Sequence, residues 1–204
     1  MKKDLTEIVF ILDRSGSMAG VVSDTIGGFN ELIKKHQAIG LECLVSTVLF
    51  DNVSEVLHDR VNIKEIKELT TNEYYVRGCT ALLDAVGSAI HHIGNVHKYI
   101  RDEDVPEKTI FVITTDGMEN ASNSYSYNDV KTMIERQKNR YGWEFIFLGA
   151  NIDAYKEASK LGIAKEFAVQ YQNDSDGVKK QYQYMSEAIR QARVEKAIRK
   201  EWKE

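Results

Sequence analysis

Proline and cysteine are almost absent from this chain of 204 residues, which contains one proline, Pro106, and two cysteines. A single proline excludes a proline-rich linker between domains. Two cysteines in a chain of this length are not a disulfide framework. Cys43 lies in an apolar stretch and is expected to behave as a small buried hydrophobic residue, and we expect Cys79 to be packed as well.

Long apolar runs are missing too. Residues 1–4 are charged, but no apolar segment of signal-peptide type follows them, and the run at 8–12 is too short to cross a membrane. Basic residues are not in excess, since the formal net charge is −4, and this argues against a general nucleic-acid binder. We therefore expect a cytoplasmic protein with no nucleic-acid or membrane partner.

Apolar runs and helical spacings alternate along the chain. The runs at 8–12 and 109–114 predict buried strands of a parallel sheet, because such strands are covered on both faces. The turn Asp51-Asn52 joins two strand-like runs, which predicts an antiparallel hairpin at a sheet edge. The pattern favours an α/β fold: a doubly wound, mostly parallel six-stranded sheet with one antiparallel edge strand and helices on both faces. The expected strands are 8–12, 41–50, 53–57, 109–114, 145–148 and 167–169, and the expected helices begin near residues 22, 80, 126, 153 and 174.

The C-terminal segment is expected to differ from the rest. We place the main domain at residues 1–173 and a helix at 174–204, packed on the domain or partly exposed. The apolar stripe of this helix changes phase near its end, where Val194, Ile198 and Trp202 form an offset stripe. An exposed Trp202 would indicate a contact with a partner.

Oxygen-bearing side chains occur at three places where this fold would bring them together. Asp13, Ser15 and Ser17 follow the first strand, Thr80 precedes a helix, and Asp116 follows the fourth strand. In doubly wound sheets, ligands bind outside the carboxyl ends of the strands, where the strand order reverses. Two carboxylates and three hydroxyls, with no histidine or cysteine, are ligands suited to a hard divalent cation such as Mg²⁺ or Mn²⁺.

These residues resemble the metal-ion-dependent adhesion site of the von Willebrand factor A (VWA) domain family. Asp13-Arg14-Ser15-Gly16-Ser17 matches Asp-x-Ser-x-Ser, Thr80 matches the distant threonine, and Asp116 matches the aspartate after the fourth strand. The resemblance covers about residues 5–170 and is greatest to stand-alone bacterial or phage members. It implies a Rossmann-like VWA fold.

The resemblance also implies a role for each residue. Ser15, Ser17 and Thr80 would offer hydroxyl oxygens to Mg²⁺, and Asp13 and Asp116 would bind it mainly through water. A cation with few directly bound carboxylates stays electrophilic and takes a further ligand, which in this family is typically an Asp or Glu of a partner protein. The implied function is a metal-dependent protein-binding module, not an enzyme.

Simpler explanations exist for each segment alone, because Asp-x-Ser-x-Ser can be a helix-capping turn and Thr80 an N-cap. The alternative function is a metal-dependent hydrolase or phosphotransferase. An aspartyl-nucleophile phosphatase would carry a second aspartate where Ser15 stands, and a hydrolase nucleophile at Ser17 would need Gly-x-Ser-x-Gly. A scaffold that no longer binds metal is a third possibility, and the five intact positions argue against it.

The residues beside Asp116 could form a rim around the metal. Gly117, Glu119 and Asn120 are the candidate partner-binding residues. The same stretch could equally be a turn that leads to the capping box Ser126-x-x-Asp129. The partner itself and the oligomeric state are left open.

Overall fold

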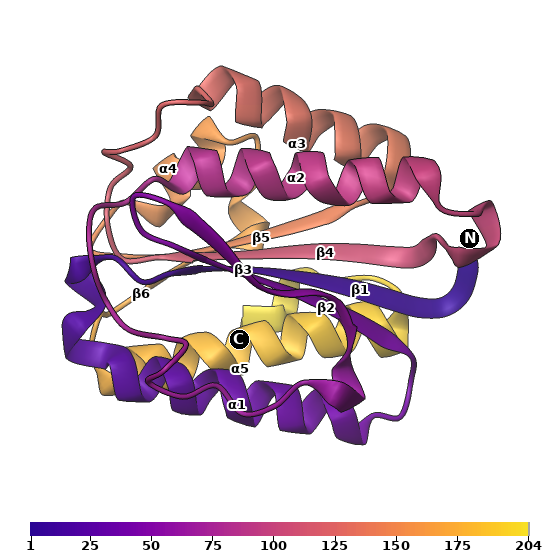
Figure 1. Ribbon diagram of the computed structural model, residues 1–204, viewed down its shortest axis with the longest axis horizontal. Coiled ribbons are helices and arrows are strands. Elements are labelled where there is room, and N and C mark those ends of the chain that lie inside the picture. Colours follow the sequence, from indigo (N-terminus) through magenta and orange to yellow (C-terminus); the bar gives the residue numbers. More distant parts are fainter. Residues whose placement is uncertain (204) are drawn as a thin grey trace.

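The computed structural model describes residues 1–203, which form one six-stranded sheet between two layers of helices (Figure 1). The strand order is β3-β2-β1-β4-β5-β6, and only β3 is antiparallel to its neighbour. The α/β fold predicted from the sequence is confirmed. The strands are β1 (Lys2–Asp13), β2 (Cys43–Phe50), β3 (Ser54–Asn62), β4 (Pro106–Thr115), β5 (Glu144–Ala150) and β6 (Ala168–Tyr171), and the α-helices are α1 (Val22–Ala38), α2 (Leu82–Tyr99), α3 (Tyr127–Tyr141), α4 (Ala154–Lys160) and α5 (Ser175–Arg190).

The two central strands explain why this order forms. Every residue of β1 from Leu5 to Asp13 is buried, and so is every residue of β4 from Thr109 to Thr115. The chain runs from β1 outward to β2 and β3, crosses over through α2, and returns beside β1 as β4 (Figure 1). The strand order therefore reverses between β1 and β4, and this is where a ligand crevice is expected.

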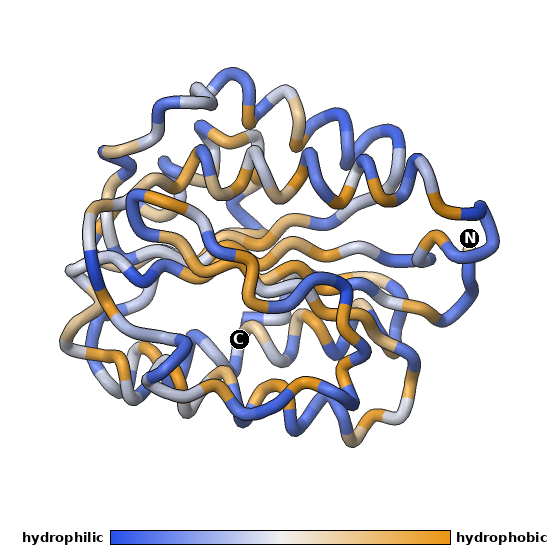
Figure 2. The backbone as a smooth tube through the Cα atoms, viewed as in Figure 1, coloured by the Kyte–Doolittle hydropathy of each residue, from blue (hydrophilic) through white to orange (hydrophobic). Residues whose placement is uncertain are grey.

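Each face of the sheet carries its own layer of helices. Helices α1 and α5 cover one face, and α2, α3 and α4 cover the other (Figure 1). The apolar residues concentrate in the strands and on the helix surfaces that face them, as the hydropathy colouring of Figure 2 shows. Helices α1 and α5 approach closely at Gly28, where an added Cβ would lie 2.3 Å from the Tyr182 ring.

The C-terminal segment departs from the continuous helix expected over 174–204. Helix α5 ends at Arg190, a π-helical turn follows at Gln191–Glu195, and Lys196 has a left-handed φ of 64°. This reversal carries Trp202 back onto the domain, where it is 1 % exposed and its Nε1 donates to the Glu166 carbonyl at 2.9 Å. Trp202 is therefore not the exposed contact that the sequence allowed.

Other local expectations have mixed outcomes. The capping box is confirmed, because Ser126 and Asp129 cap α3 reciprocally. Cys43 is buried as predicted, but the expectation that Cys79 is packed is wrong, since this residue is exposed in the loop before α2. No helix within residues 1–203 has both the length and the apolar character required to traverse a membrane.

Candidate metal centre

Three loops meet where β1 and β4 end (Figure 1). Asp13 is the last residue of β1, and Asp116 directly follows β4. These strands are parallel neighbours with Leu12 paired to Thr114, so the two aspartates leave the sheet side by side. Thr80 stands two residues before the start of α2. The fold thus brings the five residues predicted as metal ligands to one edge of the sheet.

Hydrogen bonds connect the residues from the first and third loops. The Ser17 hydroxyl donates to Asp116 Oδ1 at 2.5 Å, and Ser15 Oγ lies 3.0 Å from Ser17 Oγ. Asp13 accepts from the Ser15 N–H at 2.7 Å through Oδ1 and from the Thr115 hydroxyl at 2.6 Å through Oδ2. Two carboxylates and two serine hydroxyls therefore form a contiguous cluster.

Thr80 reaches the same place from the second loop. A Cβ added to Gly117 would lie 3.2 Å from Thr80 Oγ1 and 3.6 Å from Ser17 Oγ, so both hydroxyls face the backbone just after Asp116. Asn120 makes two hydrogen bonds to the Thr80 backbone. The Thr80 N–H donates to Asn120 Oδ1 at 2.9 Å, and the Thr80 carbonyl accepts from the Asn120 N–H at 3.0 Å.

Backbone hydrogen bonds join the first loop to the loop that carries Thr80. The Arg77 N–H donates to the Arg14 carbonyl at 2.9 Å, and the Gly16 N–H donates to the Gly78 carbonyl at 3.2 Å. Gly78 has φ +68°, and a Cβ at this position would lie 2.0 Å from Asn52 Oδ1. Any other residue would be strained at this φ and would displace the Asn52 side chain.

No basic side chain of the described residues contacts Asp13 or Asp116. Within residues 1–203 their side-chain partners are Thr115 for Asp13, and Ser17 and Asn173 for Asp116, all of them uncharged. Burial raises the pKa of Asp13 more than the hydrogen bonds from Thr115 and Ser15 lower it. Burial also raises the pKa of Asp116 to about 6 despite the hydrogen bond from Ser17, and the charge of Asp13 adds to this effect.

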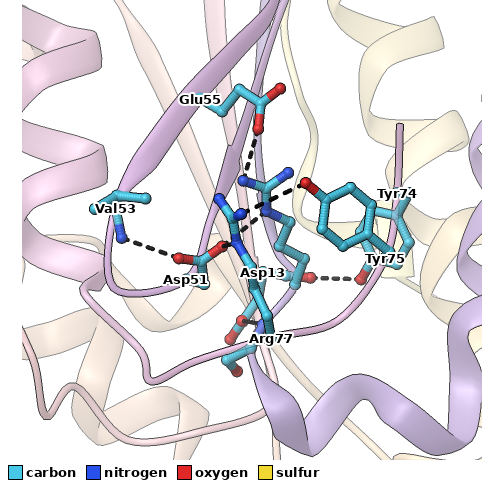
Figure 3. Close-up of polar contacts among 9 residues, drawn as sticks. Asp13, Asp51, Val53, Glu55, Tyr74, Tyr75 and Arg77 are labelled. Atoms are coloured by element: carbon cyan, nitrogen blue, oxygen red, sulfur yellow. Dashed lines mark hydrogen bonds and ion pairs between the residues drawn. The ribbon is translucent and has the colours of Figure 1, made fainter. Parts of the chain in front are cut away.

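An arginine cluster lies beside the site, and sequence reasoning missed it (Figure 3). Arg14 is fully buried; its Nε donates to Asp51 Oδ2 at 2.9 Å, and its Nη2 donates to Glu55 at 2.7 Å. Arg77 donates to the same Asp51 oxygen at 2.8 Å, and both guanidinium groups lie against the Tyr75 ring. Arg14 occupies a variable position of the motif, so nothing in the motif indicates this role.

The proposed rim residues have internal roles. Glu119 accepts from the Leu83 N–H at 2.9 Å at the start of α2, and it also accepts from the N–H groups of Ala121 and Ser122. Asn120 holds Thr80, as described above. Met118, which directly precedes Glu119, has 64 % of its surface exposed. Met118 is thus an exposed apolar side chain two residues after Asp116, and no sequence motif indicates it.

Asn173 is a further residue that sequence reasoning missed. It lies in the loop between β6 and α5, and its Nδ2 donates to Asp116 Oδ2 at 2.7 Å and to the Ser17 carbonyl at 3.4 Å. The only indication in the sequence is that Asn173 is a polar residue two positions after the carboxyl end of a strand. A fourth loop therefore reaches the cluster.

The donor set fits a hard divalent cation. It consists of three hydroxyls and two carboxylates, which are the oxygen ligands that Mg²⁺ and Mn²⁺ prefer. Four of the five residues are buried, whereas Ser17 is exposed and leaves the cluster open on one side. Groups of three or more His, Cys, Asp or Glu side chains suited to a metal do not occur in the described part of the chain.

Comparisons with known proteins bear on the fold. No family model and no curated protein sequence matches the chain. Among solved structures it is similar to a D319A mutant of the PilB minor pilin from Streptococcus sanguinis, with a TM-score of 0.61, 13 % identity, and coverage of 91 % of this chain and 61 % of that one. It is also similar to proximal thread matrix protein 1 from the mussel byssus, with a TM-score of 0.58, 14 % identity and 89 % of this chain covered against 45 % of that one.

A second structure of the byssus protein has zinc in its metal-ion-dependent adhesion site, or MIDAS, motif. It matches at a TM-score of 0.58 and 13 % identity, over 89 % of this chain and 44 % of that one. The chain spans less than two thirds of the length of each of these proteins. These likenesses are consistent with a VWA-like Rossmann fold.

Proposed function

We propose that the chain is a cytoplasmic protein-binding module that depends on a divalent cation, Mg²⁺ or Mn²⁺. Asp13, Ser15, Ser17, Thr80 and Asp116 would hold the cation. The observation that carries the proposal is the buried pair Asp13 and Asp116, which face three hydroxyls and have no basic partner within residues 1–203. Free Cys43 and Cys79 are compatible with a reducing compartment.

The hydrogen-bond directions support cation binding by the hydroxyls. The Ser17 proton points to Asp116, so Ser17 accepts the hydrogen bond from Ser15 and keeps one oxygen lone pair for a positive ion. The carboxylates contribute negative charge from the same cluster and orient the hydroxyls. When bound, the cation would supply an electrophilic centre that accepts one more oxygen ligand from outside the chain.

The surroundings of the open side indicate what that ligand belongs to. Ser17 is exposed, and Met118, two residues after Asp116, offers an apolar surface of the kind that protein partners cover. Gly117, Glu119 and Asn120 shape this rim and are the proposed partner-contact residues. We infer that a protein partner presents an Asp or Glu side chain to the cation, and that nucleic acid and membranes are not partners of this chain.

A binding role is favoured over catalysis by the neighbours of the cluster. Within residues 1–203, the hydrogen bonds of the five side chains run to serine, threonine, asparagine, aspartate and backbone groups. A general base or nucleophile in a hydrolase must lie within hydrogen-bond reach of the reacting group. The five histidines are not among these partners: His36 is on α1, His58 is on β3, and His91, His92 and His97 are on α2.

A selection from random peptides tests the proposal. The immobilised chain is offered a phage-displayed library in Mg²⁺, and bound phage are eluted with EDTA. We expect enriched peptides to share an Asp or Glu, and we expect binding to be lost in the Ser15→Ala variant. Enrichment of peptides without acidic residues, or binding that persists in EDTA, would contradict it.

A further inference from the structure

The loop between β6 and α5 makes polar contacts with the metal centre. Asn173 stands two residues after Tyr171, the last residue of β6, and directly precedes Asp174, the N-cap of α5. Its Nδ2 is shared between Asp116 Oδ2 at 2.7 Å and the Ser17 carbonyl at 3.4 Å. One amide group thus joins two of the residues proposed to hold the cation.

The orientation of this amide follows from its partners. A carboxylate oxygen and a backbone carbonyl can only accept hydrogen bonds, so the nitrogen of the Asn173 amide must face them. The oxygen Oδ1 belongs to the same small planar group and therefore lies close to the same cluster. It is buried and has no hydrogen-bond partner in residues 1–203.

A buried carbonyl oxygen without a donor is uncommon, because losing water without gaining another partner is unfavourable. The nearby end of β6 supplies a second instance. The Tyr171 hydroxyl is also buried without a partner in the described part of the chain. Burial raises the pKa of Tyr171 well above its usual value, and the charge of Asp116 contributes. Two unpaired polar atoms therefore lie on this side of the acidic cluster.

We propose that Asn173 is a sixth residue of the metal centre. The inference rests on the function proposed above. The N–H group of Asn173 holds Asp116 in the orientation that receives the Ser17 hydroxyl. Its Oδ1 provides an oxygen acceptor to the cation or to the water that the cation binds.

The choice of side chain is consistent with both tasks. Alanine would provide neither the donor nor the acceptor. Aspartate would provide the acceptor but would place a third carboxylate against Asp116, which is tolerable only when a cation is present. Asparagine supplies both groups and adds no charge. These differences define two informative variants.

The experiment is a calorimetric titration of the full chain with Mg²⁺, together with thermal unfolding in EDTA. We expect Asn173→Ala to bind Mg²⁺ about tenfold more weakly, which corresponds to one hydrogen bond to a charged group. We expect Asn173→Asp to bind at least as tightly as the unchanged protein. In EDTA this variant should unfold at a lower temperature, and Mg²⁺ should raise its unfolding temperature by the larger amount. The neighbouring exposed Gln172→Ala is the control and should behave as the unchanged protein does.

Two results would overturn this inference alone. In one, the unchanged protein binds Mg²⁺ and Ser15→Ala does not, while Asn173→Ala binds as tightly as the unchanged protein. In the other, Asn173→Ala and Asn173→Asp lose affinity equally, so that retaining an oxygen has no effect. A lack of Mg²⁺ binding by the unchanged protein would instead overturn the proposed function, and this inference with it.

Discussion

Two acidic clusters lie side by side at the carboxyl edge of the sheet, and they are balanced in opposite ways. Asp51 accepts from two arginines, Arg14 and Arg77 (Figure 3). Asp13 and Asp116 accept only from uncharged groups of the described residues. Arg14 directly follows Asp13 in the chain, yet its side chain turns to Asp51 and Glu55.

The pKa shifts reflect this difference. Burial by itself would raise the pKa of Asp51, but hydrogen bonds from Arg77, the Val53 N–H and Arg14 outweigh it and lower the pKa. The pKa values of Asp13 and Asp116 are raised instead. The chain thus supplies the countercharge for the arginine cluster, whereas under the proposed function an ion from solution would supply that of the acidic pair. One cluster joins the loops, and the other would be the binding site.

Removing the carboxylate of the arginine cluster should have the largest effect on stability. Asp51→Ala leaves the fully buried Arg14 without its main countercharge, so we expect a loss of about 3–5 kcal/mol in the free energy of unfolding. Urea denaturation measures it. Glu55→Gln is the matched control, because the Glu55 side chain is 52 % exposed and the expected loss is under about 1 kcal/mol. Equal stabilities of the two variants would show that Arg14 does not depend on Asp51.

A buried histidine in the last turn of α1, His36, separates effects of pH from effects of the cation. Burial lowers the pKa of His36 to about 4, and the charge of Arg193 adds to this shift. The unfolded chain therefore binds the proton more tightly than the folded one. The contribution of His36 is complete above about pH 6.5 and is lost as the pH falls to about 4, with a total of about 3 kcal/mol.

Urea denaturation between pH 4 and pH 7 checks this expectation. His36→Gln should remove that part of the pH dependence, by the same amount with and without Mg²⁺, because the histidine lies between α1 and α5 and not at the metal centre. The same pH dependence in the variant and the unchanged protein would contradict the assignment.

The parts of the structure that could be predicted from the sequence are those carried by local pattern. The apolar runs of β1 and β4 identified the central strands. The spacing of Asp13, Ser15 and Ser17, with Thr80 and Asp116, indicated which residues gather at the edge of the sheet. Both patterns consist of consecutive or regularly spaced residues, which can be recognised in a single sequence.

The features that escaped prediction depend on contacts between distant residues. Arg14 pairs with a carboxylate 37 positions away, and Asn173 contacts Asp116 across 57 positions; neither has a local signature. The end of α5 was hidden because apolar residues continue to Trp202. In the sequence, the reversal at Lys196 is indicated only by the change of phase in the apolar stripe at Val194. The position of Trp202 after the reversal depends on its hydrogen bond to Glu166, which the sequence does not display.

One substitution tests the acidic pair without disturbing its neighbours. In Asp13→Asn, the amide oxygen can still accept from the Ser15 N–H, and the amide nitrogen can donate to Thr115 Oγ1. The Thr115 hydroxyl is then free to donate to the Gly117 carbonyl, which lies 3.1 Å away. We expect this variant to fold and, in EDTA, to be no less stable than the unchanged protein, because it removes a buried charge.

The most direct measurement is the calorimetric titration of Mg²⁺ into the unchanged protein, Asp13→Asn and Glu55→Gln. Both variants remove one carboxylate from the same edge of the sheet, but only Asp13 belongs to the pair whose partners among residues 1–203 are all uncharged. We expect the unchanged protein and Glu55→Gln to bind one Mg²⁺ with equal affinity, and each to gain about 2.7 kcal/mol of stability at a Mg²⁺ concentration of one hundred times Kd. We expect no binding to Asp13→Asn. Equal binding by Asp13→Asn and the unchanged protein, or no binding by the unchanged protein, would contradict the claim that the acidic pair is a cation site.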